Sequence, residues 1–158
     1  EDQKFGVPLS EVPALVAKIR SHNHLKFLGL HSHIGSQIFG AEGFVEAAKR
    51  LIQVHAELLK GGEVSELNLG GGFGINYTRA DDAPEITELA KQIANAVKAQ
   101  CDAAGIAVPK LAFEPGRVIA GPGTVTLYNV GTTKDVSVTE GAEPAVRKYV
   151  SAAADSAS

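Results

Sequence analysis

Three short apolar stretches alternate along this chain with long segments of helical periodicity, and this alternation limits the folds that it can adopt. The strand-like stretches are expected at residues 25–32, 65–69 and 110–113, and the helices at residues 11–21, 41–59 and 85–104. Apolar strands that alternate with helices of this length favour a parallel sheet with right-handed crossovers. We therefore expect an α/β fold with the order α-β-α-β-α-β.

Polar residues and glycines follow each strand at its carboxyl end. The first strand leads to His31, His33, Gly35 and Ser36, the second to Gly70, Gly71 and Gly72, and the third to Glu114, Pro115, Gly116 and Arg117. In a parallel sheet, ligands bind beyond the carboxyl ends of the strands. These residues are therefore expected to share one site.

The glycine triplet at 70–72 is a candidate phosphate site, because adjacent backbone N–H groups without side chains can surround an anion. Glycine triplets also occur in ordinary turns, so phosphate binding and a plain turn are about equally favoured by the triplet alone. The run GGGFGINY does not have the GxGxxG spacing that opens a helix. A dinucleotide-binding fold is thus poorly supported.

The two histidines of the first strand allow more than one interpretation. His31 and His33 are two residues apart, so on an extended strand they share a face. With Glu114 they could form a metal triad, as in a metal-dependent barrel hydrolase. Alternatively, one imidazole stacks on a flat cofactor. A hydrogen-bonded core histidine would account for one of them but not for both.

Glu114 follows the apolar run LAF and precedes Pro115, so we expect its carboxylate to be fixed and partly desolvated. A buried carboxylate needs a cationic partner or a proton donor. Arg117 could supply this partner in a salt bridge. A protonated pyridine nitrogen would do so better, and Arg117 would then remain free to bind a substrate carboxylate or a phosphate.

Composition restricts the class of protein. The 158 residues are 44% hydrophobic and 21% charged, which is enough for one domain with a core. The net charge is −3 and the basic residues are scattered, so nucleic acid is not an expected partner. No apolar run approaches the roughly 20 residues of a membrane span, and the first residues do not resemble a signal peptide. We expect no membrane association and a cytoplasmic location.

The last quarter of the chain changes character. Residues 121–138 are rich in β-branched residues without helical periodicity, which indicates an extended strand that leaves the α/β layer. Residues 139–158 are rich in Ala, Ser and Glu, so we expect a poorly ordered tail there. The expected divisions are an α/β domain over residues 1–123, a connecting strand over 124–138 and the tail.

Three motifs in this order, HSHIGSQ, LNLGGGFGINY and EPGRVIAGPGT, resemble the alanine-racemase-type pyridoxal-phosphate decarboxylases, and among them the diaminopimelate decarboxylases of lysine biosynthesis. The likeness extends from Lys4 to about Val138. It implies part of a (β/α)8 TIM-type barrel, because three strands cannot close a barrel of eight. It also implies an amino-acid substrate, a homodimeric parent enzyme and a missing C-terminal β-domain.

The resemblance also implies a role for each motif residue. His33 would stack on the ring of pyridoxal 5'-phosphate, and Ser36 with Gly70, Gly71 and Gly72 would bind its phosphate. Glu114 would pair with the ring nitrogen. Pro115 and Gly116 would belong to the cofactor site, as would Arg117, which would also face the substrate. The reaction would convert meso-2,6-diaminopimelate to L-lysine and CO2, with ornithine and arginine as alternative substrates.

One part of the family's machinery has no counterpart here. The family binds its cofactor covalently through a lysine on an early barrel strand, whereas Lys26 and Lys110 stand at the beginnings of their strands. We therefore expect a fragment that is inactive alone and binds the cofactor weakly at best. A metal-dependent hydrolase and a non-catalytic protein that binds a phosphate ligand are the alternatives.

Overall fold

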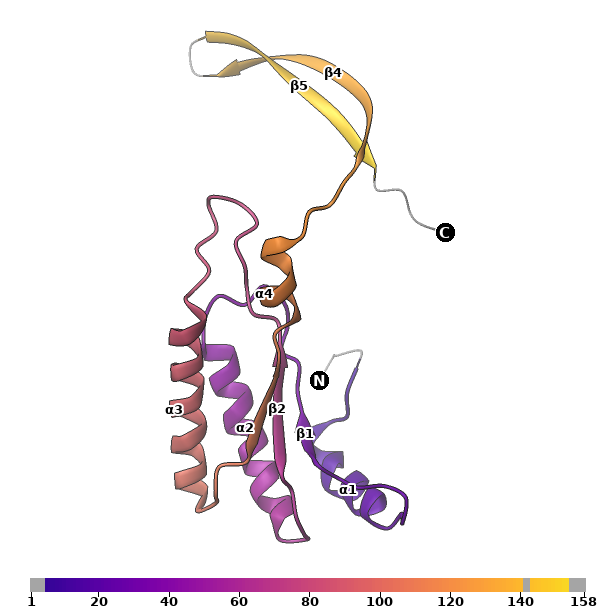
Figure 1. Ribbon diagram of the computed structural model, residues 1–158, viewed down its shortest axis with the longest axis vertical. Helices are drawn as coiled ribbons and strands as arrows, with labels where there is room; N and C mark the ends of the chain where they lie inside the picture. Colours follow the sequence, from indigo (N-terminus) through magenta and orange to yellow (C-terminus); the bar gives the residue numbers. More distant parts are fainter. Residues whose placement is uncertain (1–4, 141–142, 154–158) are drawn as a thin grey trace. The chain divides into compact units, whose positions relative to one another are not determined.

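The computed structural model describes residues 5–140 and 143–153, and the contacts divide the chain into two units, Glu1–Pro122 and Gly123–Ser158. The elements of the first unit begin with a 3-10 turn, Leu9–Glu11, and continue as α1 (Val12–Arg20), β1 (Gly29–His31), α2 (Glu42–Leu59), β2 (Glu66–Gly71), α3 (Ile86–Ala104), β3 (Lys110–Glu114) and α4 (Gly116–Ala120) (Figure 1). A 3-10 turn, Gly121–Gly123, then leads to β4 (Asn129–Glu140) and β5 (Glu143–Ala153).

The first unit has an α/β fold with a parallel sheet, as its sequence predicts. The strand order is β1-β2-β3, and both pairs are parallel. The register aligns Leu30 with Leu67 and Leu67 with Leu111. It becomes irregular between Asn68 and Gly71, where Gly71 pairs with Glu114 at the carboxyl edge of the sheet.

The two long helices form where 3.6-residue periodicity is strongest. The apolar face of α2 buries Phe44, Ala48 and Ile52. The corresponding face of α3 buries Ile93, Val97 and Cys101. α3 ends at Gly105, whose φ of 67° is a left-handed conformation that glycine adopts without steric cost.

The sheet has one covered and one open face. Leu67 and Leu69 of β2 are fully buried and belong to the same core cluster as the apolar faces of α2 and α3. Side chains alternate along a strand, so Asn68 points to the opposite face. By the same register, His31 and Glu114 lie on this second face, which we call the open face.

Two expectations about the last third of the chain are wrong. The extended strand expected over residues 121–138 does not begin at Gly121: α4 is followed by the 3-10 turn Gly121–Gly123, and β4 begins only at Asn129. The expected poorly ordered tail contains β5, which pairs with β4 in an antiparallel ladder. Val146, Tyr149 and Val150 supply the strand propensity that the Ala and Ser content obscured. Residues 141–142 and 154–158 of that tail lie outside the described residues.

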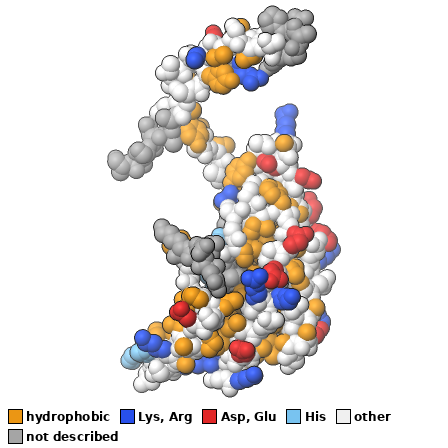
Figure 2. Space-filling model, turned by 180° about the vertical axis from the view of Figure 1, so that it is seen from behind, with side chains coloured by type: hydrophobic (Ala, Val, Ile, Leu, Met, Phe, Trp, Pro, Cys, Tyr) orange, Lys and Arg blue, Asp and Glu red, His pale blue; other side chains and the backbone are white. Residues whose placement is uncertain are grey.

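The surface carries mixed charge. On the face drawn in Figure 2, lysine and arginine side chains of the α/β unit are interspersed with aspartate and glutamate, and hydrophobic side chains are visible between them. Large hydrophobic residues that remain exposed include Leu25, Leu28, Val108 and Ile119. None of the helices in the described part of the chain combines the length and the apolar character needed to cross a membrane.

Candidate functional site

The glycine triplet lies where three chain segments approach one another. Gly70 and Gly72 have φ values of 73° and 94°, which side chains disfavour. A Cβ atom on Gly70 would overlap the carbonyl oxygen of Ser32, and it would lie 3.1 Å from the Cα of His33. A Cβ atom on Gly71 would overlap the carbonyl oxygen of Glu114. Glycine is therefore required here because backbone from both neighbouring strands packs against the triplet.

The side chain of Gln37 connects the segment after β1 to the segment after the glycine triplet. The amide of Gln37 donates to the carbonyl of Ile75 over 2.8 Å and accepts from the Ile75 N–H over 3.3 Å. Gln37 has a φ of 57°, and it is the one described non-glycine residue with positive φ. Ile38 and Phe73 form a parallel bridge beside it. These contacts hold the turn that contains Ser36 next to the glycine triplet.

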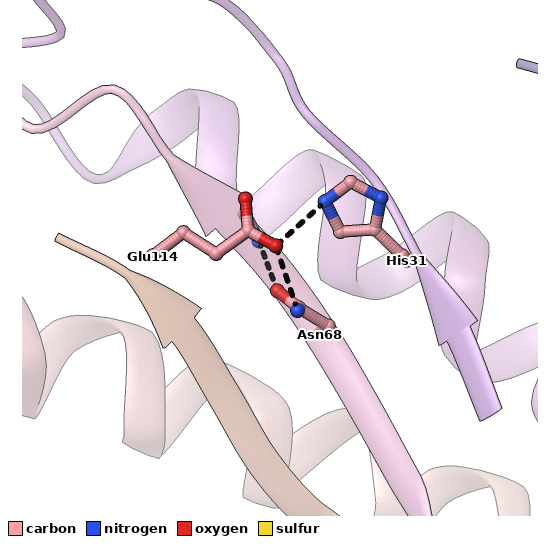
Figure 3. Close-up of polar contacts among 4 residues, drawn as sticks. His31, Asn68 and Glu114 are labelled. Carbon is pink, nitrogen blue, oxygen red and sulfur yellow. Dashed lines mark hydrogen bonds and ion pairs between the residues drawn. The ribbon is translucent and has the colours of Figure 1, made fainter. Parts of the chain in front are cut away.

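Glu114 is the centre of a polar cluster on the open face (Figure 3). Its Oε1 accepts a hydrogen bond from Nδ2 of Asn68 over 3.0 Å and lies 3.3 Å from Nε2 of His31. The three side chains come from three adjacent strands. The Glu114 side chain is 51% exposed, so the expected desolvation of its carboxylate is absent, because no described element covers the open face.

Asn68 links this cluster to the glycine triplet. Its Oδ1 accepts a hydrogen bond from the Gly70 N–H over 2.8 Å, which leaves its amide nitrogen directed at Glu114. The backbone at the triplet and the carboxylate of Glu114 are thus connected through one side chain. No role was assigned to Asn68 from the sequence, although its position two residues before Gly70 allows its side chain to accept from the Gly70 N–H.

Arg117 belongs to a different set of contacts from Glu114. Its Nη1 donates to the hydroxyl of Tyr77 over 2.9 Å, and its guanidinium carbon lies 5.8 Å from the centre of the Tyr77 ring. The alternative of an Arg117–Glu114 salt bridge is therefore not realised. α4 begins immediately after Pro115 and turns the Arg117 side chain toward the loop after β2.

That loop is held by Asp81. Oδ2 of Asp81 accepts hydrogen bonds from the N–H groups of Tyr77 and Thr78 and from the Thr78 hydroxyl, at 2.9, 2.7 and 3.1 Å. The hydrogen bonds from Thr78 are the main cause that lowers the pKa of Asp81, and the Tyr77 N–H adds to them. Tyr77, which sequence reasoning did not select, is fixed at its backbone by these bonds.

The remaining predicted site residues lie around the same edge. His33 and Ser36 are both exposed, in the segment that packs against the triplet. Pro115 is half-buried at the start of α4, and Gly116 is surrounded by open space, since a Cβ there would meet nothing within 4 Å. The glycine triplet therefore lies next to the backbone of His33 and Glu114, whereas the Arg117 side chain is hydrogen-bonded to Tyr77.

The metal triad of His31, His33 and Glu114 does not form in the described residues. β1 ends at His31, so His33 is no longer on the same strand, and only His31 contacts Glu114. No group of three or more histidine, cysteine, aspartate or glutamate side chains in the described ranges could hold a metal ion. A metal-dependent hydrolase has no structural support from these residues.

Comparisons with known proteins identify the same family that the three sequence motifs resemble. Residues 1–121 match the family model for the pyridoxal binding domain of pyridoxal-dependent decarboxylases. Diaminopimelate decarboxylases from Mycobacterium bovis and Staphylococcus aureus are 46% and 43% identical to this chain, and in each case the similarity covers 96% of it. It covers 35% and 34% of those proteins, so the chain spans about a third of the length of the curated relatives it matches.

Solved structures give the same result. The crystal structure of diaminopimelate decarboxylase from Helicobacter pylori complexed with L-lysine is similar with a TM-score of 0.65 at 26% identity. This similarity covers 75% of the present chain and 28% of the Helicobacter chain. The parallel α/β arrangement is therefore the arrangement found in part of that enzyme.

Proposed function

Because residues 1–121 match its pyridoxal binding domain, the chain belongs to the pyridoxal-dependent decarboxylase family, and we propose that it is the cofactor-holding part of a diaminopimelate decarboxylase. The proposed parent reaction converts meso-2,6-diaminopimelate to L-lysine and CO2. The bond between the D-configured carbon and its carboxylate breaks, CO2 leaves, and a proton takes its place on that carbon. Pyridoxal phosphate supplies the electron sink that this bond cleavage requires.

The observation that carries the proposal is the arrangement around Glu114. Its Oε1 accepts a hydrogen bond from Asn68 and lies 3.3 Å from Nε2 of His31, and its Oε2 has no partner among the described residues. An ionised carboxylate accepts hydrogen bonds only, so a ring N–H is the chemical group that suits Oε2. The residues present therefore fit a pyridinium ring on the open face.

The other proposed cofactor contacts surround this carboxylate. The missing side chains of Gly70, Gly71 and Gly72 let neighbouring backbone pack against the triplet, which brings the segment with His33 and Ser36 next to it. We assign phosphate binding to the triplet and Ser36, and ring stacking to the exposed imidazole of His33. The assignment extends the family resemblance to these positions.

The residues after Glu114 complete the proposed site. Pro115 lies between β3 and α4 as the N-cap of α4, and the open space at Gly116 leaves room for a ligand atom. Arg117 is proposed to contact the cofactor and to bind the substrate carboxylate, for which a planar guanidinium with two parallel donors is well suited. Its contact with Tyr77 keeps this donor group near the site edge.

The proposal includes the larger architecture. The three parallel strands would be part of a (β/α)8 barrel, and β4 and β5 would lead toward the β-domain of the parent. A homodimeric parent and a cytoplasmic location remain predictions, which sedimentation of the parent and cell fractionation would test. Lys26 precedes β1 and Lys110 begins β3, so neither lysine stands at the carboxyl edge of the sheet where the cofactor is proposed to bind.

Two experiments test the proposal. The purified chain should bind pyridoxal phosphate weakly and form no lysine from meso-diaminopimelate, so measurable lysine production by it would contradict the expected inactivity. In a chimera, this chain would replace the matching third of a related diaminopimelate decarboxylase. Lysine formation is expected with the native segment and loss of activity with Glu114→Ala. A chimera that is active only on ornithine or arginine would show that the substrate assignment is wrong.

A further inference from the structure

We propose that His31 and Asn68 are positioning residues for Glu114, which direct its Oε2 at the ring nitrogen of a bound pyridoxal-type ligand. This inference rests on the proposed function and extends it to two residues that the motif comparison did not assign. Both residues act through Glu114. Nδ2 of Asn68 donates to Oε1 of Glu114, and Nε2 of His31 lies 3.3 Å from the same oxygen, so Oε2 is left as the acceptor for a ligand (Figure 3).

The carboxylate needs such partners because it is half exposed. The Glu114 side chain is 51% exposed, and a glutamate side chain at a surface samples several rotamers whose loss on binding costs free energy. Nδ2 of Asn68 at 3.0 Å and Nε2 of His31 at 3.3 Å approach Oε1 from two neighbouring strands. Together these two contacts restrain Oε1 and reduce the number of rotamers that Glu114 samples before the ligand arrives.

The orientation of Asn68 is itself set by the backbone. The Gly70 N–H donates to Oδ1 of Asn68 over 2.8 Å, so the amide nitrogen must face Glu114. A chain of two hydrogen bonds therefore runs from the first glycine of the triplet to the carboxylate. The Asn68 side chain would therefore fix the position of the ring-binding carboxylate of Glu114 relative to the phosphate-binding glycine triplet.

This arrangement makes Asn68→Asp an informative variant. Aspartate keeps the acceptor for the Gly70 N–H, but it places a second carboxylate oxygen beside Oε1 of Glu114. The resulting repulsion would turn Glu114 away from the ligand while the glycine triplet keeps its contact. His31→Leu removes the polar contact of the imidazole with Glu114, and His31→Gln restores a polar N–H group of similar reach.

The experiment compares two probes on the full 158-residue chain. Pyridoxine 5'-phosphate contains the ring and the phosphate but has no aldehyde that could react with lysines, and inorganic phosphate reports the phosphate contacts alone. Affinities are measured by NMR titration of the wild type, Asn68→Asp, His31→Leu, His31→Gln and the matched control His24→Leu, an exposed histidine outside the site.

We expect Asn68→Asp and His31→Leu to bind pyridoxine 5'-phosphate about five- to tenfold more weakly, with inorganic phosphate affinity unchanged. His31→Gln should recover most of the loss, and His24→Leu should bind like the wild type. Equal affinity of the wild type, Asn68→Asp and His31→Leu for pyridoxine 5'-phosphate would overturn the positioning roles alone. A parallel loss of inorganic phosphate affinity would also overturn them, since it would indicate a general structural effect. A wild-type chain that does not bind pyridoxine 5'-phosphate would overturn the proposed function as well.

Discussion

Arg117 donates a hydrogen bond to the Tyr77 hydroxyl over 2.9 Å, and the two side chains also stack with 5.8 Å between the guanidinium carbon and the ring centre. Neither Arg117 nor its neighbour in the motif, Glu114, therefore neutralises the other. The contact with Tyr77 orients the Arg117 guanidinium as a hydrogen-bond donor at the edge of the site. Tyr77 is in turn held by Asp81, so a loop 40 residues away in sequence determines where the guanidinium lies.

The first prediction concerns Arg117. Arg117→Lys should lower the affinity of the chain for pyridoxine 5'-phosphate about tenfold, because an ammonium group cannot reproduce the planar pair of donors. Tyr77→Phe keeps the ring contact and loses only the hydroxyl, so a smaller loss of about twofold is expected. Isothermal titration would measure both, with Arg50→Lys on the exposed face of α2 as the control. An unchanged affinity in Arg117→Lys would exclude a contact of this residue with the cofactor.

The second prediction separates two requirements for glycine. Gly70→Ala and Gly105→Ala both force alanine into positive φ, at 73° and 67° respectively. At Gly105 the new methyl group meets nothing within 4 Å, so the loss should be about 1–2 kcal/mol of unfolding free energy. At Gly70 it also overlaps the Ser32 carbonyl, and the loss should be clearly larger. Urea unfolding would compare them, and equal losses would show that the backbone segments separate easily.

The third prediction concerns the loop that Asp81 holds. Asp81→Asn should weaken the bonds to the N–H groups of Tyr77 and Thr78, because a neutral amide oxygen is a poorer acceptor than a carboxylate. Amide hydrogen exchange of these two residues should accelerate severalfold. Asp82→Asn, at the exposed neighbouring position, should leave the exchange unchanged. If both variants exchange alike, the loop is ordered by contacts other than Asp81.

Sequence periodicity predicted the elements that pack through long apolar faces. The helices expected at residues 41–59 and 85–104 are α2 and α3, whose starts differ by one residue and whose C-terminal ends agree, because each buries a continuous face in the core. Two further elements, α4 and β5, were not predicted. α4 has only five residues, and β5 gains its order from pairing with β4, which no local pattern in an Ala- and Ser-rich segment reveals.

In the candidate site, too, some features follow from local sequence pattern and others depend on how the strands pair. That the glycine triplet and Glu114 would lie at one edge followed from the parallel sheet, in which all strands end on the same side. The contacts of Glu114 depend instead on register: His31 and Asn68 are aligned residue to residue, and the irregularity after Asn68 brings Glu114 opposite Gly71. Register between strands is not encoded in the motif spacing, so Asn68 received no role from the sequence.

The last prediction concerns His55, which lies in the core of the first unit. Its side chain is 1% exposed, and its Nδ1 has no hydrogen-bond partner among the described residues. Burial lowers the pKa of His55, because the charged imidazolium is poorly solvated there. The folded chain therefore keeps His55 neutral at a pH where the unfolded chain, with a pKa of about 6.5, already takes up a proton.

The sign of the effect on stability follows from this difference. The contribution of neutral His55 is fully present above about pH 6.5 and is lost as the pH falls toward its lowered pKa, with a slope of at most about 1.4 kcal/mol per pH unit. Asp81 and Glu46, whose pKa values are lowered by hydrogen bonds, add to the loss only near and below about pH 4. Urea unfolding at pH 7.5, 6.5 and 5.5 should show a decline that disappears in His55→Leu and persists in His24→Gln. The same decline in His55→Leu would mean that another group takes up the proton, and that the buried imidazole is not what makes the fold sensitive to mild acid.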